Sequence, residues 1–169
     1  MGFDFRFRLA DSTNDISLLI DFLSLQDLGY PKYQDWVQRA EQELYGGQKT
    51  GILAFSNNRL VGDLVFQPHK ELPRTRELKN IRVHPKLRGR YFANFMLRQA
   101  EIEGRDDYDL ILCDARTDQH AMINLLRISG YVPIATVQLY DGNAEDVVMA
   151  KSFEETSEAG ILHRARSLF

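Results

Sequence analysis

The chain has 169 residues, 44% of them hydrophobic and 11% aromatic, and a formal net charge of −3. This is enough for one domain with a hydrophobic core and too little for two ordinary ones. No apolar stretch approaches the ~20 residues that span a bilayer, and the N-terminal residues carry charges where a signal peptide is apolar. We therefore expect a soluble, cytoplasmic protein with no membrane partner. Cys113 is the single cysteine, which excludes an internal disulfide, and the four histidines lack metal-ligand spacing, so we expect no metal.

The hydrophobic pattern, taken in chain order, predicts seven strands and four helices. Period-two alternation marks the strands, and 3.6-residue spacing marks the helices. Capping and breaking residues set the bounds, with Asp118 as the expected cap of the last helix. We expect a strand at 3–9, a helix after caps at 11–14, a helix at 32–45, strands at 50–56 and 59–67 joined by an Asn57-Asn58 turn, a strand at 76–83, a helix at 91–104, a strand at 109–116, a helix at 119–129, and a hairpin of strands 131–140 and 146–153.

Positive charge is concentrated in the middle of the chain. Between Pro73 and Arg98 there are eight Lys or Arg residues and one acid, Glu77, whereas the rest of the chain holds 13 bases and 23 acids. A basic segment in an acidic protein favours an anionic ligand. Two alternatives are a solvated charged face and, less favoured at this net charge, a nucleic-acid interface whose affinity falls steeply with salt.

The segment IRVHPKLRGRYFANFML, residues 81–97, joins the end of a strand to the start of a helix. The first turn of a helix presents N–H groups without intrahelical partners and the positive end of the helix dipole, which together suit a phosphate. Arg88 and Arg90 add charge, Gly89 permits close approach of the backbone, and Ala93 keeps the first turn thin. The pattern therefore predicts a pyrophosphate cradle at residues 88–93.

The string from Ile81 to Glu101 resembles motif A of the GNAT superfamily of acyl-CoA-dependent N-acyltransferases, and QHAMINLLRISGY (119–131) resembles its motif B. The superfamily signature is Arg or Gln, then any two residues, a Gly, any one residue, and a Gly or Ala. Arg88 matches its first position and Ala93 its last. Tyr91 stands where the first glycine is usual. The resemblance covers about residues 3–153. It implies a mixed α/β GNAT-like fold with a central, mostly antiparallel sheet of about seven strands, splayed fourth and fifth strands and four flanking helices. We expect this acetyltransferase domain at 1–153 and a separate tail at 154–169.

The resemblance implies an N-acetyltransferase that moves an acetyl group from acetyl-CoA, as co-substrate, to a primary amine by direct attack in a ternary complex. The alternative is a non-catalytic acyl-CoA sensor or interaction module. Backbone groups at 81–83 are expected to pair with pantetheine and to stabilise an oxyanion. Helical dihedral angles at Tyr91 would add no strain, and we expect its ring to point outward. The residues implied to contact the cofactor are Ile81, Arg82, Val83, Arg88, Gly89, Arg90, Tyr91, Phe92, Ala93 and Gln119.

Catalysis needs a base for the amine and can use an acid for the departing thiolate. Glu77 is the first candidate base, with a surface ion pair as its alternative role. Asp114 is the second, and its alternative role is to cap the loop that follows its strand. Leu126 stands where many family members carry a general-acid tyrosine. The thiolate therefore leaves unassisted or draws on Tyr131 or Tyr140. Cys113 lies in an apolar strand and is expected to be an inert core thiol.

We expect the acceptor to be a cationic amine, either a small molecule or the lysine or N-terminus of a peptide, because acids and aromatic residues flank the region that binds acceptors in this family. These acids and aromatic residues are Asp21, Asp27, Tyr30, Tyr33, Asp35, Trp36, Glu41, Glu43, Asp141, Glu145 and Asp146. A solvated helix face explains many of these charges equally well. The tail carries an apolar stripe at helical spacing, which predicts a short helix. We favour a helix docked on its own domain or on a partner, in a monomer or a homodimer, and the alternative is a frayed tail. The stripe consists of Ile161, Leu162, Ala165, Leu168 and Phe169.

Overall fold

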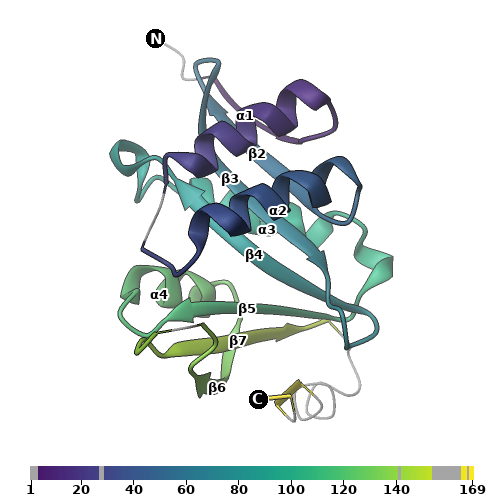
Figure 1. Cartoon of the computed structure of the whole chain (residues 1–169), viewed down its shortest axis with the longest axis vertical. Helices are drawn as coiled ribbons and strands as arrows, with labels where there is room; N and C mark the ends of the chain where they lie inside the picture. The colour runs from purple at the N-terminus through teal and green to yellow at the C-terminus, as the bar shows by residue number, and fades with distance from the viewer. Residues whose placement is uncertain (1–3, 27–28, 141, 154–164, 167) are drawn as a thin grey trace. The chain divides into compact units, whose positions relative to one another are not determined.

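The computed structural model describes residues 4–26, 29–140, 142–153, 165–166 and 168–169 (Figure 1). Two short 3-10 helices, which the hydrophobic pattern does not predict, span Pro85–Leu87 and Arg105–Asp107. The other elements are β1 (Phe5–Leu9), α1 (Thr13–Ser24), α2 (Tyr33–Tyr45), β2 (Thr50–Ser56), β3 (Arg59–Pro68), β4 (Thr75–Val83), α3 (Phe92–Ile102), β5 (Leu110–Arg116), α4 (His120–Ile128), β6 (Val132–Val137) and β7 (Asp146–Ser152).

The seven strands form a sheet in the order β1-β2-β3-β4-β5-β7-β6. β4 and β5 run parallel, with α3 as the crossover helix, whereas the pairs β1/β2, β2/β3, β5/β7 and β6/β7 are antiparallel. Within the described residues there are four α-helices. The mixed α/β class, the strand number and the helix number predicted from the sequence are therefore confirmed. The splay of β4 from β5 and the domain boundary at residue 153 stay predictions.

Local sequence signals explain most element boundaries. Ser12 caps α1, since its hydroxyl accepts the N–H of Asp15 at 3.1 Å. Asn57 and Asn58 both have positive φ, at 50° and 64°, as a two-residue hairpin turn between antiparallel strands requires. The prediction that Asp118 caps α4 is wrong. Gln119 occupies the N-cap, and its side chain makes no capping hydrogen bond.

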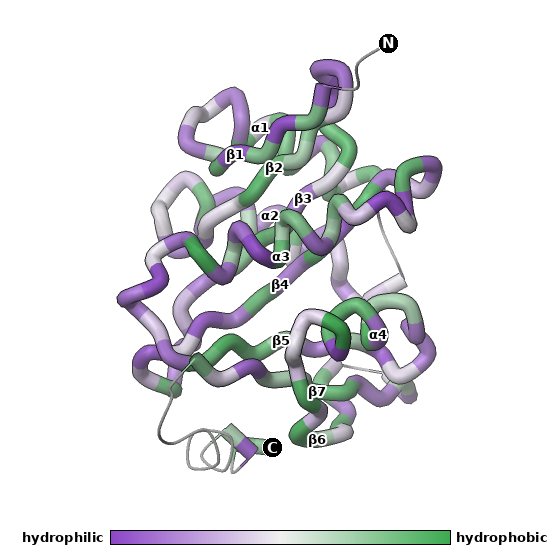
Figure 2. The backbone as a smooth tube through the Cα atoms, turned by 180° about the vertical axis from the view of Figure 1, so that it is seen from behind, coloured by the Kyte–Doolittle hydropathy of each residue, from purple (hydrophilic) through white to green (hydrophobic). Residues whose placement is uncertain are grey.

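The chain divides into two compact units, Met1–Gln67 with Lys79–Glu103 and Pro68–Leu78 with Gly104–Phe169. β4 contributes to both. In the first unit, α1 and α2 cover one face of the strands and α3 covers the other, as Figure 1 and the reverse view in Figure 2 both show. The α1/α2 face buries a hydrophobic cluster of Ile16, Leu19, Leu23, Tyr33, Val37, Leu44, Leu53 and Val65.

The opposite face of the first unit packs aromatic rings against α3. The ring of Phe92 meets Phe5 edge-on at 5.0 Å between centroids and Phe7 at 6.0 Å. On the same face, a Cβ at position 62 would lie 3.0 Å from the carbonyl oxygen of Arg82 and 3.1 Å from the side chain of Met96. Gly62 therefore allows β3, β4 and α3 to approach one another closely.

In the second unit the apolar residues follow β5 and β7 (Figure 2). Leu110 and Leu112 of β5 pack with Ala150 of β7 and with Ala165, which is completely buried. This contact docks the described part of the C-terminal segment on its own unit. The rest of the predicted tail helix, including Ile161 and Leu162, lies outside the described residues.

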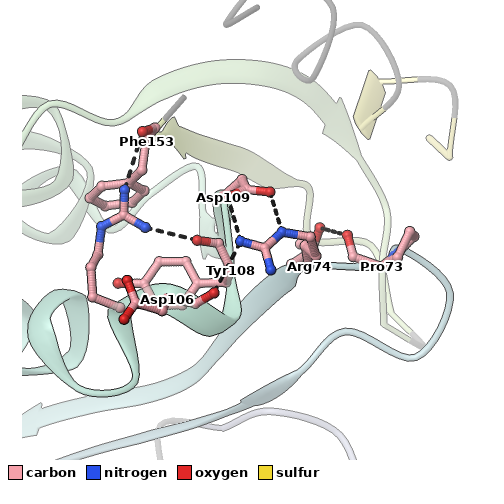
Figure 3. Close-up of polar contacts among 8 residues, drawn as sticks. Pro73, Arg74, Asp106, Tyr108, Asp109 and Phe153 are labelled. Carbon is pink, nitrogen blue, oxygen red and sulfur yellow. Dashed lines mark hydrogen bonds and ion pairs between the residues drawn. The ribbon is translucent and has the colours of Figure 1, made fainter. Parts of the chain in front are cut away.

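A polar network fixes the start of β4 beside the start of β5 (Figure 3). Arg74 donates twice to the carboxylate of Asp109, at 2.6 and 2.9 Å, and once to the carbonyl of Asp106 at 3.1 Å. Arg105 donates to the carbonyls of Tyr108 at 2.8 Å and Phe153 at 3.1 Å. The parallel register of β4 and β5 begins directly after this network, with Thr75 opposite Leu110.

We predict that Asp109→Asn lowers the melting temperature at pH 7. The hydrogen bond from Arg74 lowers the pKa of Asp109 in the folded protein, so its stabilising effect is full above the unfolded pKa and is lost as pH falls through the folded one. Because the pair is partly exposed, we expect a loss of ~1 kcal/mol or less at pH 7. The difference in stability between the parent protein and the variant should shrink below about pH 4. Thermal melts at both pH values measure it, and Asp106→Asn, which keeps the backbone acceptor, is the control. An equal loss at the two pH values would contradict the electrostatic origin.

Candidate functional site

The loop from β4 to α3 carries the predicted anion cradle. His84 accepts the N–H of Lys86 through Nδ1 at 3.3 Å, which starts the 3-10 turn after the strand. Gly89 has a φ of +74°, and a Cβ placed there would meet no atom within 4 Å. The backbone at Gly89 is therefore open on that side, as the close approach of a ligand requires.

The start of α3 supplies donors to this loop. The first helical bond runs from the N–H of Phe95 to the carbonyl of Tyr91 at 3.0 Å, so the preceding N–H groups of the first turn have no intrahelical acceptor. The first turn contains no acidic residue. Arg88 and Arg90 are exposed beside it. Unpaired N–H groups, the helix dipole and two cations together give a site that can hold a phosphate-bearing group.

Tyr91 does not take the helical dihedral angles that would leave it free of strain. It is the N-cap of α3, with a φ of +66° and a ψ of 3°. A residue with a Cβ pays ~1–2 kcal/mol for the left-handed region because the Cβ crowds the following carbonyl oxygen. The backbone thus has the conformation that a glycine adopts without strain, which accounts physically for the glycine usual at this place in the motif. The residue is 70% exposed, and the direction of its ring relative to bound phosphates stays a prediction.

Some of the residues predicted to contact the cofactor in the first unit have their side chains bound to the backbone or buried in the core. Arg88 Nε donates to the carbonyl of Val83 at 3.2 Å, and Arg82 donates to the carbonyl of Ile81 at 3.3 Å. Phe92 is 3% exposed, with its ring in the core, so only its backbone is placed to meet a ligand. The predicted backbone contacts of residues 81–83 with pantetheine stay predictions.

The two candidate bases, Glu77 and Asp114, lie on the same face of the sheet in the second unit. Glu77 stands opposite Leu112 in the parallel β4/β5 register, and Asp114 is two residues further along β5. Alternate residues of a strand share a face, and both acids are half-buried. Asp114 directly follows the last register pair of this unit, Leu78 with Cys113. Cys113 is buried, as predicted.

Asp114 has two titratable neighbours from other elements. Tyr140 donates its hydroxyl hydrogen bond to Asp114 Oδ2 at 2.9 Å. Asp146, at the start of β7, is 1% exposed. Burial and then the charge of Asp114 raise the pKa of Asp146, while the backbone N–H of Leu139 and the charge of Arg116 oppose this rise.

The two tyrosines considered as proton donors have different environments. Tyr131 is 2% exposed, with Lys151 Nζ lying 5.7 Å from its ring centroid. Tyr140 is 40% exposed and contacts a candidate base. Leu126, at the position of the family tyrosine, is completely buried. Of these three residues, Tyr140 has the environment that suits proton transfer.

A polar cavity of about 420 Å³ lies at this end of the second unit. The N–H of Thr117 donates to the carbonyl of Glu145 at 2.9 Å, which joins two of its walls. Arg116 Nε lies 3.4 Å from Asp118 Oδ1. The charged side chains of the lining are therefore one base and two acids, which favours a cationic or polar occupant. The lining consists of Arg116, Thr117, Asp118, Gln138, Asn143, Ala144 and Glu145.

Some residues expected near an acceptor or cofactor have structural roles. Tyr33 is buried and donates to the carbonyl of Leu23 at 2.8 Å, and Glu43 forms an ion pair with Lys49 at 2.6 Å. Gln119 is half-buried at the N-cap of α4, and its contact with pantetheine stays a prediction. Two acids of the expected acceptor region, Asp27 and Asp141, lie outside the described residues.

Sequence reasoning missed a buried acid in the first unit. Asp63, on β3, is completely buried and accepts a hydrogen bond from the side-chain amide of Asn80 on β4. Burial raises the pKa of Asp63 to about 7, against the opposing effects of the Arg82 charge and the Asn80 hydrogen bond. The only sequence signal was a single charge within the apolar run LVGDLVF.

The sequence profile described as Acetyltransferase (GNAT) family matches residues 16–131. No curated protein matches the sequence. Within the described residues no helix is both long and apolar enough to cross a membrane. The same residues include no group of three or more His, Cys, Asp or Glu side chains placed to hold a metal ion.

Solved structures share the fold at low sequence identity. A GNAT-family protein from Desulfovibrio desulfuricans has a TM-score of 0.77 at 14% identity, over 89% of this chain and 100% of the other. The ribosomal-protein alanine N-acetyltransferase of Escherichia coli has a TM-score of 0.72 at 17% identity, over 92% and 97%. An aminoglycoside 6'-N-acetyltransferase complexed with coenzyme A has a TM-score of 0.72 at 15% identity, over 90% and 99%.

We predict that Tyr91→Gly stabilises the protein relative to Tyr91→Ala. Both variants remove the ring, but only glycine relieves the left-handed strain, so the free energies of unfolding should differ by ~1 kcal/mol. Urea unfolding of the two variants measures the difference. Equal stability would show that the loop relaxes to a negative φ when the ring is removed.

We predict that Asp63→Asn gains stability over the parent protein as pH rises. The ordinary pKa of Asp is 3.8 and the folded value is about 7, so between these values the folded protein holds a proton that the unfolded chain has lost. The parent protein therefore loses up to ~1.4 kcal/mol per pH unit in this range. Urea unfolding at pH 4.5, 6 and 8 should show an advantage of the variant that grows up to about pH 7 and then levels off. An advantage that is constant with pH would contradict the raised pKa.

Proposed function

Because the chain belongs to the GNAT acetyltransferase family, we propose that it is an N-acetyltransferase that transfers the acetyl group of acetyl-CoA to a primary amine. The observation that carries the proposal is the loop at residues 88–93. Its open backbone at Gly89, the unpaired N–H groups at the start of α3 and two exposed arginines fit a pyrophosphate. Coenzyme A carries such a group, and it supplies the activated acetyl thioester.

Each group of predicted site residues has its own chemical role in this reaction. The loop binds the diphosphate, and backbone N–H groups at 81–83 orient the acyl group and stabilise negative charge on its carbonyl oxygen. Asp114 or Glu77 takes the proton of the attacking amine. A bond forms between nitrogen and the carbonyl carbon, the carbon–sulfur bond breaks, and the electron pair leaves with sulfur. The thiolate is then protonated by solvent or by the acid form of the base.

We assign the principal base role to Asp114 rather than to Glu77. Asp114 lies on β5 directly after the last register pair with β4 in the second unit. It also has a hydrogen-bond donor, Tyr140, that orients its carboxylate. Glu77 lies on the same face and is the second candidate. Substituting each acid by its amide compares the two roles.

The acceptor that fits these features is a cationic amine. The polar cavity of the second unit is lined by two acids, Asp118 and Glu145, and one base, Arg116, together with neutral side chains. Two solved structures with this fold are named as N-acetyltransferases, one acting on a ribosomal-protein alanine and one on an aminoglycoside. Small cationic amines and peptide amines are therefore the first acceptors to test.

We predict that Arg88→Glu weakens coenzyme A binding at least about tenfold, because it replaces a charge-assisted contact with repulsion. Isothermal titration calorimetry measures the affinity, and circular dichroism checks the fold. Arg98→Glu reverses an exposed charge on α3 outside the loop and should change the affinity much less. Equal losses in both variants would point to a general electrostatic effect, and an unchanged affinity for Arg88→Glu would refute the site.

Catalysis is tested by thiol release from acetyl-CoA with a diamine, an aminoglycoside, a lysine-bearing peptide and a peptide with a free N-terminus. We expect amine-dependent release with at least one of these acceptors. Coenzyme A binding without release across the whole panel would favour the non-catalytic sensor instead. Mass spectrometry of the acceptor confirms that the acetyl group is on nitrogen.

A further inference from the structure

The carboxylate of Asp114 has neighbours that act on it in opposite ways. We infer that Tyr140 and Asp146 are positioning residues that set the proton affinity of Asp114, Tyr140 by lowering it and Asp146 by raising it. The inference rests on the proposed function, which assigns the principal base role to Asp114. It gives Tyr140, considered above only as a proton donor to the thiolate, a different role, and it adds Asp146 to the residues that act on the base.

Tyr140 acts through a direct hydrogen bond. Its hydroxyl donates to Asp114 Oδ2 at 2.9 Å. A donor on one carboxylate oxygen stabilises the ionised form more than the protonated form. Asp114 is half-buried, so water does not fully replace this donor when it is removed. The bond also limits rotation of the carboxylate.

Asp146 acts through its charge. It lies at the start of β7 opposite Arg116, while Asp114 lies opposite Val148, so the two acids are on the same face of adjacent strands. The charge of Asp114 is, after burial, the largest effect that raises the pKa of Asp146. Such a coupling is reciprocal. An ionised Asp146 therefore makes Asp114 hold its proton more tightly.

The other charged groups near Asp114 and Asp146 do not form a second pair with opposite effects on Asp114. Arg116, on β5, favours the ionised form of Asp146, and Asp118, after β5, disfavours it. Glu77 shares the sheet face on the β4 side. On the α4 side the first helical residue, His120, is exposed. Tyr140 is distinguished by its hydrogen bond to the Asp114 carboxylate. Asp146 is distinguished by carrying the same charge as Asp114 on the adjacent strand.

The proton affinity of Asp114 decides whether it can accept the proton that leaves the amine. The amine proton passes to Asp114 as the nitrogen–carbon bond forms, so the carboxylate must be ionised in the free enzyme. It must also be basic enough to accept the proton. The acidic limb of the pH profile of kcat/KM reports the protonation of this free-enzyme base. Two residues with opposite effects on Asp114 should therefore move this limb in opposite directions.

The test measures kcat/KM from pH 5 to 9 with acetyl-CoA and an amine that supports turnover. We expect Tyr140→Phe to move the acidic limb to higher pH and Asp146→Asn to move it to lower pH, each by about half a unit or more. A purely structural role would lower activity without opposite shifts. Tyr45→Phe is the matched control, since Tyr45 is a half-exposed tyrosine whose hydroxyl contacts Ser17 at 3.2 Å in the first unit. Shifts of both variants in the same direction, or no shift, would overturn the inference.

Two further measurements separate this inference from the proposed function. Asp114→Asn should lose most activity at every pH, and an unchanged profile would remove Asp114 as the base. Titration of the Asp114 carboxyl carbon by NMR, in the parent protein and in both variants, needs no substrate. Opposite displacements of its midpoint support the inference even if no amine is acetylated, whereas parallel or absent displacements refute it.

Discussion

The parallel register of β4 and β5 is the constraint on which the candidate catalytic residues depend. It begins beside the network in which Arg74 holds Asp109 and Arg105 holds two backbone carbonyls. With Thr75 opposite Leu110, residue 77 falls opposite 112, and Asp114 follows on the same face. A shift of one residue would turn one of the two acids to the other face. The network therefore fixes which side chains share the reactive face, although none of its members is assigned a chemical role.

The molecule keeps several polar groups where they reduce stability. Asp63 is completely buried, Asp146 nearly so, and Tyr91 has a left-handed backbone. Each arrangement costs free energy, through desolvation in the two acids and through steric crowding in the tyrosine. Tyr91 lies in the proposed anion cradle and Asp146 on the same sheet face as the proposed base, so two of these costs coincide with the proposed chemistry. Asp63 has no such assignment, and its neighbours Asn80 and Arg82 act to keep it ionised.

The sequence predicted those parts of the structure that depend on local chemistry. The Asn57-Asn58 turn, the Ser12 cap and the end of β4 before Pro85 follow from neighbouring residues alone. The loop at 88–93 could be proposed as an anion site because its charges, its glycine and the helix start are contiguous in sequence. Tyr91 was included in the predicted helix at 91–104, whereas the structure gives it a positive φ, which a tyrosine rarely adopts.

Contacts between distant segments could not be predicted in the same way. Tyr140 and Asp114 are 26 positions apart, and Asp63 and Asn80 are 17 apart. Asp63 and Asn80 meet because β3 and β4 are neighbours in the sheet, and Tyr140 reaches Asp114 from the segment after β6. Neither contact follows from neighbouring residues in the sequence. Asp118 was preferred as the cap of α4 on residue type, but the helix begins one residue later, after Gln119. Such one-residue differences are common at helix ends because alternative caps are close in energy.

The burial of Ala165 has a practical consequence for handling the protein. This residue covers Leu110 and Leu112, while Leu168 and Phe169 are exposed at the end of the chain. Shortening the chain before Ala165 would therefore uncover two leucines on β5. Uncovered apolar surface promotes self-association. Recombinant versions of the protein should therefore retain Ala165 and the residues that follow it.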